Sequence, residues 1–202
     1  MTAAPAVHRV ALKEWASVCL ALERGRQLVL IRKGGLAEPG QGFEFRADRF
    51  LFYPTYEHQT GQFLRDDARP LFDESMALRP RADTLSITLY AEVVTSALSS
   101  SAETIRRLEP FHIYNEAFLS QRLQWQPEQP LVIGIVRAFR LPAERSLRLQ
   151  PHYRGCTSWV ELDEPIDVAN AKPVIETKCF EEQRRRIEAF MRDIAPSAPP
   201  AR

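Results

Sequence analysis

The chain has 202 residues and a formal net charge of +1, with 45% hydrophobic and 26% charged residues. These values are typical of a globular domain that can bury one hydrophobic core, and they argue against disorder along the whole length. The balanced charge excludes a global electrostatic field that would draw the protein to DNA or to a membrane.

Three cysteines, Cys19, Cys156 and Cys179, are odd in number and form no CxxC motif. This pattern favours free thiols in a reducing compartment. No apolar run approaches the roughly 18 residues of a membrane span, and the N-terminal residues lack the pattern of a secretory signal. We therefore expect a cytoplasmic protein without a membrane segment.

The first predicted element is a helix over residues 12–22, because apolar residues recur there at helical spacing and Gly25 follows as a stop. A strand over 28–31 comes next. It leads into Arg32 and Lys33, and the two glycines that follow favour a turn.

Two further strands are predicted at 43–45 and 49–53, the second ended by Pro54. Residues 56–65 form another helix candidate. The segment 66–83 carries two prolines and many charges, so we expect it to be mostly loop.

The second half of the chain begins with a half-buried strand over 85–93, where apolar and polar residues alternate. Short helices are predicted at 101–108 and 115–123. The strand at 131–141 is apolar on both faces at its start, so it should be central. A last short strand follows at 158–162.

An amphipathic helix is predicted between residues 180 and 194. The result is about six strands in runs and about four helices, with no regular βαβ alternation. This pattern predicts an α+β fold with a mixed, curved or barrel-like sheet and the helices packed around it. We expect a flexible N-terminus at 1–9, a single domain at 10–194 and a disordered tail at 195–202.

Five segments of the sequence resemble a bacterial family catalogued as domain-of-unknown-function family 1802. They are LKEW at 12–15, LIRKGG at 30–35, FLFYPTYEHQ at 50–59, LQWQPEQPL at 123–131 and CTSWVEL at 156–162. The resemblance covers roughly residues 10–162 and implies no activity.

The order of elements also resembles the opening of PUA-like domains of the ASCH and EVE branches, small β-barrels associated with RNA or modified bases. This resemblance implies a cleft lined by the first helix and a basic strand. The chain departs from that pattern in the long stretch between Tyr53 and Leu85. Likeness at the level of fold is a weak warrant for function.

Arg32 and Lys33 are the first candidate ligand-binding residues, because two cations beside paired glycines can hold an anion. An ordinary hairpin turn with surface charges is the alternative. The segment 53–59 is the second candidate, since a loop after an apolar strand often carries function. It offers the polar side chains of Tyr53, Thr55, His58 and Gln59. His58 is either an acid, base or base-contacting donor, or a group that caps a helix or bonds the core.

Arg122 lies at four-residue spacing from Phe118 and Tyr114, on one helical face. It either binds a phosphate or carboxylate in a cleft, or lays its stem over the core. Trp159 and Glu161 share one face of a strand. Trp159 is either a stacking platform for a base or a core residue.

These residues predict a binding module for RNA, DNA or a nucleotide-like ligand, with no membrane partner, no metal and no cofactor. One alternative is a nuclease-like hydrolase that uses Glu44, His58 or Glu161. Another is a protein-interaction module that uses the basic stretch 137–154 or the C-terminal helix. The oligomeric state is left open.

All three thiols should be free in the native protein. Labelling under denaturing, non-reducing conditions should therefore count every cysteine of the chain as reactive. A count of one would reveal a disulfide and would contradict the reducing compartment.

Overall fold

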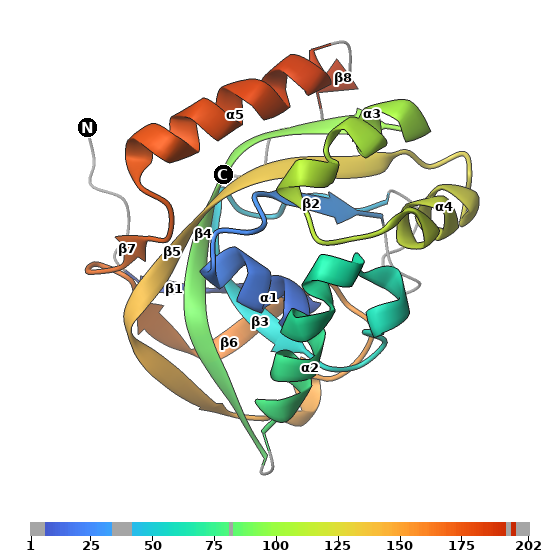
Figure 1. The fold of residues 1–202 in the computed structure, drawn as a ribbon. Helices are drawn as coiled ribbons and strands as arrows, with labels where there is room; N and C mark the ends of the chain where they lie inside the picture. The colour runs from blue at the N-terminus through green and yellow to red at the C-terminus, as the bar shows by residue number, and fades with distance from the viewer. Residues whose placement is uncertain (1–6, 34–41, 81–82, 193–194, 197–202) are drawn as a thin grey trace.

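A curved, mixed sheet forms the centre of the computed structural model, which describes residues 7–33, 42–80, 83–192 and 195–196 (Figure 1). The sheet has eight strands in the order β2-β5-β4-β3-β1-β6, with β7 on β5 and β8 on β4. The bounds are β1 Val7–Trp15, β2 Val29–Arg32, β3 Arg49–Thr55, β4 Thr84–Ser99, β5 Leu131–Arg148, β6 Trp159–Asp167, β7 Lys172–Pro173 and β8 Ala195–Pro196. Only β1 and β3 pair in parallel.

The two longest strands, β4 and β5, pair antiparallel along nearly their whole length. Their register shifts at two irregularities, and such bulges bend a strand and increase its twist. Figure 1 shows both strands sweeping across the molecule as a curved ribbon. Within β5, Gly134 lies under the Phe45 ring, where an added Cβ would come within 2.4 Å of the ring. The absence of a side chain at Gly134 therefore lets Phe45 pack directly on the sheet.

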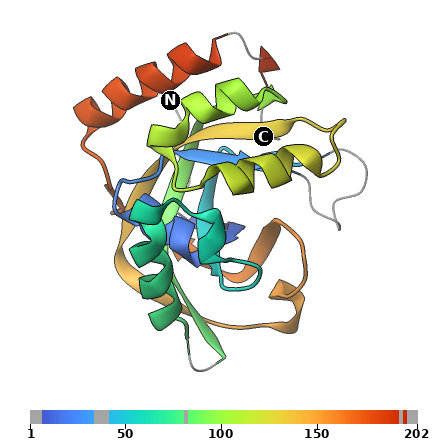
Figure 2. The ribbon, with the colours of Figure 1, turned by 45° about the vertical axis from the view of Figure 1, so that its right-hand side comes forward.

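In the described part of the chain, five α-helices cover the sheet. Their bounds are α1 Ala16–Glu23, α2 Arg69–Ala77, α3 Ala102–Arg107, α4 Glu116–Gln124 and α5 Thr177–Met191. Helix α1 contacts α2, and α3 contacts both α4 and α5. Figure 2 shows these two groups of helices separated along the curved sheet. No helix of the described residues is long and apolar enough to cross a membrane.

The expected fold class is confirmed: the chain is α+β, and its mixed sheet is strongly curved and flanked by helices. The predicted strands at 28–31, 49–53, 85–93, 131–141 and 158–162 are all present, and most extend further than predicted. Within the described residues no backbone pairing joins the edge strands β2 and β6, so the sheet stays open.

The helix predicted at 12–22 begins only at Ala16, and residues 12–15 are the end of β1. Strand β1 lies between β3 and β6, and its residues from Ala11 to Glu14 are all buried. A strand buried on both faces lacks the alternation that identifies strands in sequence. Because the apolar residues of β1 continue at helical spacing into α1, the sequence pattern predicted a helix where β1 ends.

Three local expectations also need correction. The segment 66–83 contains α2, which accommodates Pro70 in its first turn, where a proline removes no helical hydrogen bond. The segment 56–65 contains only the short 3₁₀ helix Gly61–Phe63. Residues 43–45 form no strand, although the Phe43 and Phe45 rings are buried in the core.

Pro54 does not end its strand, and it pairs with Glu14 of β1. Pairing between β3 and β4 stops at Leu51, so no β4 carbonyl needs an N–H at position 54.

The ends of the chain also differ from expectation where the structure describes them. Residues 7–9, assigned above to a flexible N-terminus, belong to β1 and lie beside β6. Residues 195–196, assigned to a disordered tail, form β8 and pair with β4. The remaining parts of both predicted tails, residues 1–6 and 197–202, lie outside the described residues.

His112, in the segment that connects α3 to α4, is fully buried. Its Nδ1 accepts a hydrogen bond from the Tyr114 N–H at 3.2 Å. Burial, helped by the charge of Arg65, lowers the pKa of His112 to about 4. The unfolded chain would bind a proton near pH 6.5, so unfolding takes up this proton as the medium becomes acidic.

Stability should therefore fall as the pH drops from about 6.5 toward about 4, by on the order of 3 kcal/mol for this group. Above that pH window His112 is neutral in both the folded and the unfolded chain, so its burial no longer lowers the free energy of unfolding. Denaturant midpoints across the window should fall less steeply for His112→Phe than for the native chain. A matched control is His58→Gln at an exposed position, which should keep the native steepness. Equal slopes for His112→Phe and the native chain would contradict a buried neutral His112.

Candidate functional site: a basic cleft beside a tyrosine-lined pocket

Two cavities adjoin at the end of the sheet where β1 and β3 terminate. We call the first the basic cleft: its volume is about 420 Å³, and its lining includes Arg32, Lys33, His58 and Arg122. We call the second the tyrosine pocket: its volume is about 400 Å³, and its lining includes Tyr53, Tyr56 and Tyr153. They share Lys13, Thr55, Glu57 and Gly155, so the two cavities are neighbours on either side of these residues. Both volumes are in the range of small-ligand sites.

Parallel pairing of β1 with β3 explains why the polar residues meet here. In this register Lys13 lies beside Tyr53 and Trp15 beside Thr55. Parallel strands end at the same edge of a sheet, so the last side chains of both strands reach the same region. The turn after β3 then carries Glu57 and His58 to the cleft.

Strand β2 reaches the cleft by a different route, because it is an edge strand that pairs with β5 and is no neighbour of β3. The curvature of the sheet brings its last residue, Arg32, back against β1. Arg32 donates to the carboxylate of Glu14 at 3.0 Å, to the main-chain oxygen of Lys13 at 3.2 Å and to the Ser158 hydroxyl at 3.0 Å. The Arg32 side chain therefore spans the gap between the two edges of the open sheet.

Glu14 is the buried counter-charge of the cleft, with only 4% of its surface exposed. One carboxylate oxygen accepts from Arg32, and the other accepts from the Trp15 N–H at 2.9 Å. The main-chain oxygen of Glu14 accepts from the Thr55 hydroxyl at 3.2 Å. A buried carboxylate needs such partners, since an unpaired one is strongly destabilising.

Arg122 and Lys33 add further positive charge on the α4 side of the cleft. Burial, followed by the charge of Arg32, lowers the pKa of Arg122. Burial, followed by the charge of Arg122, likewise lowers the pKa of Lys33. The Lys33 ammonium donates to the main-chain oxygen of Arg122 at 2.9 Å. Cations held this close repel one another, and a bound anion would relieve the repulsion.

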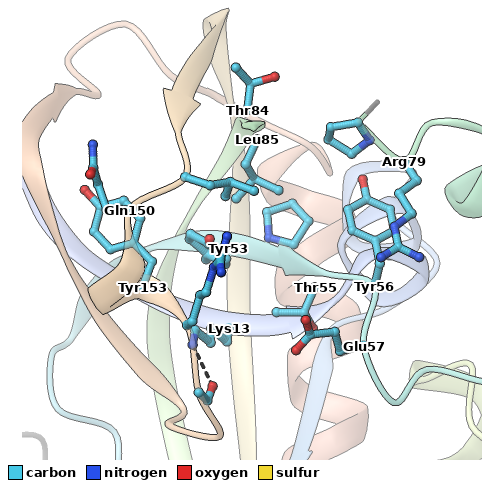
Figure 3. Close-up of a pocket in the computed structure, with 15 residues that line it drawn as sticks. Lys13, Tyr53, Thr55, Tyr56, Glu57, Arg79, Thr84, Leu85, Gln150 and Tyr153 are labelled. Atoms are coloured by element: carbon cyan, nitrogen blue, oxygen red, sulfur yellow. Dashed lines mark hydrogen bonds between the residues drawn. The ribbon is translucent and has the colours of Figure 1, made fainter. Parts of the chain in front are cut away.

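Tyrosine rings line the second cavity, and Figure 3 shows them around the Lys13 side chain. The Tyr53 and Tyr153 rings meet edge to face, with centroids 6.1 Å apart. Across the pocket, the Arg79 guanidinium lies 5.7 Å from the centre of the Tyr56 ring. Burial, with Tyr153 and Glu57 nearby, raises the pKa of Tyr53 to about 12, so its phenol is a hydrogen-bond donor at neutral pH.

Lys13 connects the two cavities. Its ammonium donates to the main-chain oxygen of Gly155 at 2.9 Å, as drawn in Figure 3, and lies 5.9 Å from the centre of the Tyr53 ring. Burial lowers the pKa of Lys13, against the opposing effect of the Glu57 carboxylate. An ammonium has three protons, so two donors are left after the bond to Gly155.

Five of the residues predicted as ligand-binding line the basic cleft together. They are Arg32, Lys33, Thr55, His58 and Arg122. His58 is exposed, and its positive φ of 62° turns the chain sharply after Glu57. Tyr53 lies in the adjoining tyrosine pocket.

The other predicted residues lie elsewhere. The Gln59 side-chain oxygen accepts from the N–H and hydroxyl of Ser17, so it ties the turn to α1. Trp159 is 7% exposed, packs on Phe43 and Phe50, and donates from its ring to the main-chain oxygen of Glu44. Its role is therefore in the core, which is the alternative described above.

The two carboxylates proposed for hydrolysis, Glu44 and Glu161, have exposed side chains and line neither cavity. Among the residues that the structure describes, no group of three or more His, Cys, Asp or Glu side chains is placed to hold a metal ion. The cysteines are free, and the exposed Cys156 lies in the lining of the basic cleft.

Two of the five arginines in the basic stretch 137–154 form contacts within the chain. Arg137 donates to Thr177, and Arg140 bonds to Glu23. In α5, Arg184 pairs with two carboxylates of the same helix.

Sequence reasoning missed Lys13, Glu14, Tyr56, Glu57 and Arg79. Lys13 and Glu14 were assigned to a helix, which hid their place at the end of a strand. Tyr56 and Glu57 stood within the segment that was singled out, and their polar groups were available as a signal. Arg79 stood in a segment expected to be loop, and nothing local links it to Tyr56.

Residues 11–186 match the family described as Domain of unknown function (DUF1802). The chain belongs to this family. The match includes the residues of β1, β2, β3 and α4 that line both cavities.

No curated protein matches the chain. A similar solved structure is that of a mutant ZmASCH protein from Zymomonas mobilis, at 10% sequence identity and a TM-score of 0.47. The likeness covers 80% of this chain and 92% of the other. A likeness at this level says nothing of what this chain binds.

Replacing Arg32 by alanine should leave the buried Glu14 carboxylate without its counter-charge. This should lower the free energy of unfolding by about 3–5 kcal/mol. Denaturant unfolding measures this cost. The matched control is Arg24→Ala, which removes an exposed ion pair with Glu74 and should cost at most about 1 kcal/mol. Similar losses in the two variants would contradict a special role for the buried pair.

Proposed function

We propose that this domain binds a nucleotide unit, as part of a single-stranded RNA or as a smaller nucleotide ligand. The observation that carries the proposal is that a cationic cleft and a tyrosine-lined pocket adjoin and share four lining residues. In this arrangement a phosphate lies in the basic cleft and a base lies in the tyrosine pocket.

Charge supports the phosphate position. Lys13, Arg32, Lys33 and Arg122 line the basic cleft, against the carboxylates of Glu14 and Glu57. Such a surplus of cations at a concave surface concentrates anionic ligands. A guanidinium also matches phosphate geometry, because it donates two parallel hydrogen bonds.

Aromatic chemistry supports the base position. Exposed bases of single-stranded nucleic acids stack on aromatic side chains, and each such contact contributes about 1–3 kcal/mol. Tyr53, Tyr56 and Tyr153 provide rings on opposite sides of the pocket. The phenol of Tyr53, the Thr55 hydroxyl and the imidazole of His58 supply polar contacts in this proposal. Cytoplasmic localisation belongs to the same proposal, since RNA and nucleotides are abundant there.

Arg122→Gln tests the proposal with the least disturbance of the fold, because the main-chain oxygen that accepts from Lys33 is kept. Loss of one phosphate contact should weaken binding to short RNAs of any sequence by a similar factor. It should also reduce the slope of log affinity against log salt concentration by about one. Fluorescence anisotropy with labelled RNA at several salt concentrations measures both quantities.

The matched control is Arg185→Gln, an exposed arginine of α5 that lies outside both cavities. It should bind like the native chain. Competition by nucleoside monophosphates distinguishes the two ligand sizes, because a small ligand displaces the RNA only if one nucleotide unit suffices. Unchanged affinity in Arg122→Gln, or equal losses in both variants, would contradict the phosphate position.

A further inference from the structure

The tyrosine pocket contains a carboxylate that the phosphate-binding role leaves unexplained. Glu57 is the one acidic side chain among the described residues that line this pocket. Within the described part of the chain it forms no ion pair with a lysine, arginine or histidine. A negative charge here opposes the attraction of a phosphate, so its presence calls for a different partner.

The surroundings of Glu57 specify that partner. A carboxylate accepts hydrogen bonds and donates none, and its two oxygens can accept two parallel donors. Lys13 lines the same pocket and keeps two donors after its bond to Gly155. Figure 3 shows both side chains at one side of the pocket, below the three labelled tyrosines in that view, with the Lys13 ammonium directed to the Gly155 oxygen. The pocket therefore offers two acceptors, cationic donors from Lys13, Arg79 and Arg154, and the flat rings of its tyrosines.

Among the common bases, guanine has the hydrogen-bonding groups that match these acceptors and donors. Its Watson–Crick edge carries two adjacent donors, N1–H and N2–H, beside the acceptor O6. Adenine and cytosine place a lone pair next to their amino group, which would face one carboxylate oxygen. Uracil has one N–H between two carbonyls, which would repel the second oxygen. Bases of single-stranded RNA are recognised by such edge contacts together with stacking.

Resting on the proposed function, we propose that the tyrosine pocket selects guanine. The Glu57 carboxylate accepts from guanine N1–H and N2–H, and the Lys13 ammonium donates to O6. The base stacks on Tyr56, whose ring the Arg79 guanidinium supports. The phosphate of the same nucleotide extends into the basic cleft past Thr55, which lines both cavities.

The test compares short uridine RNAs that carry guanine, inosine, adenine, cytosine or uridine at one central position. Anisotropy competition with the full chain should give guanine a roughly tenfold advantage over adenine, cytosine and uridine, the usual effect of a good bidentate contact. Inosine lacks the N2 amino group and should fall between guanine and the others. This comparison uses the unaltered protein and so does not depend on the folding of a variant.

Glu57→Gln should abolish the advantage of guanine, because an amide replaces one of the two acceptors by a donor. Glu57 is exposed, so the change should leave the unfolding temperature near that of the native chain. The matched control is Glu182→Gln, an exposed carboxylate of α5, which should keep the full preference.

Equal affinities for all five RNAs, or a guanine preference that survives in Glu57→Gln, would overturn the guanine contact. If binding is still salt-dependent in those cases, the proposed function stands without it. Absence of salt-dependent binding to every RNA would overturn both proposals together.

Discussion

The side chain of Arg32 closes a sheet that the backbone leaves open. The strands run from the edge strand β2 to the edge strand β6, and the sheet curls until these edges approach each other. Arg32 at the end of β2 then bonds to Glu14 of β1 and to Ser158, the residue before β6. Because a buried carboxylate needs a cation, this contact fixes the distance between the edges. The positions of the cleft residues on β1 and β2, and of those just before β6, depend on it.

The same contact explains why the cleft can hold several cations without losing the fold. Glu14 compensates for one of them inside the protein, and Lys33 and Lys13 donate to main-chain oxygens. Burial still lowers the pKa values of Lys13, Lys33 and Arg122, so their charges are costly in the free protein. Strain of this kind is common at binding sites, where a ligand of opposite charge relieves it.

Much of the fold could be predicted from the sequence, because most strands show their periodicity directly. The strand at 131–141 and the helix at 115–123 are examples in which local pattern and tertiary packing agree. Strand β1 could not be predicted, since burial on both faces removes alternation and the apolar spacing runs on into α1. The clustering of Arg32, Lys33, Thr55, His58 and Arg122 was foreseeable from strand ends and turns. Their shared cleft nevertheless arises from a curled sheet, with no pairing between β2 and β3.

The carboxylates show the limit of local patterns most clearly. Glu14 and Glu161 look alike in sequence, as acidic residues among apolar ones. One is buried beside an arginine that is distant in the chain, and the other faces solvent at the surface of β6. Only the three-dimensional arrangement separates them, because the partner that stabilises Glu14 lies on another strand.

The place of β1 between β3 and β6 also sets the order in which the chain can fold. Strand β3 follows β1 closely in the sequence, whereas β6 comes roughly a hundred residues after β3. During synthesis β1 therefore has an unpaired edge until β6, which is made much later, leaves the ribosome. Closing so long a loop is entropically costly, and contacts between distant segments form slowly. The Lys13 N–H bonds to the Ser158 oxygen at 2.8 Å, so the cleft is completed only when the segment that leads into β6 is in place. Because β6 also supplies Val160 and Leu162 to the core, a nascent chain completes its core and its binding surface in the same late step.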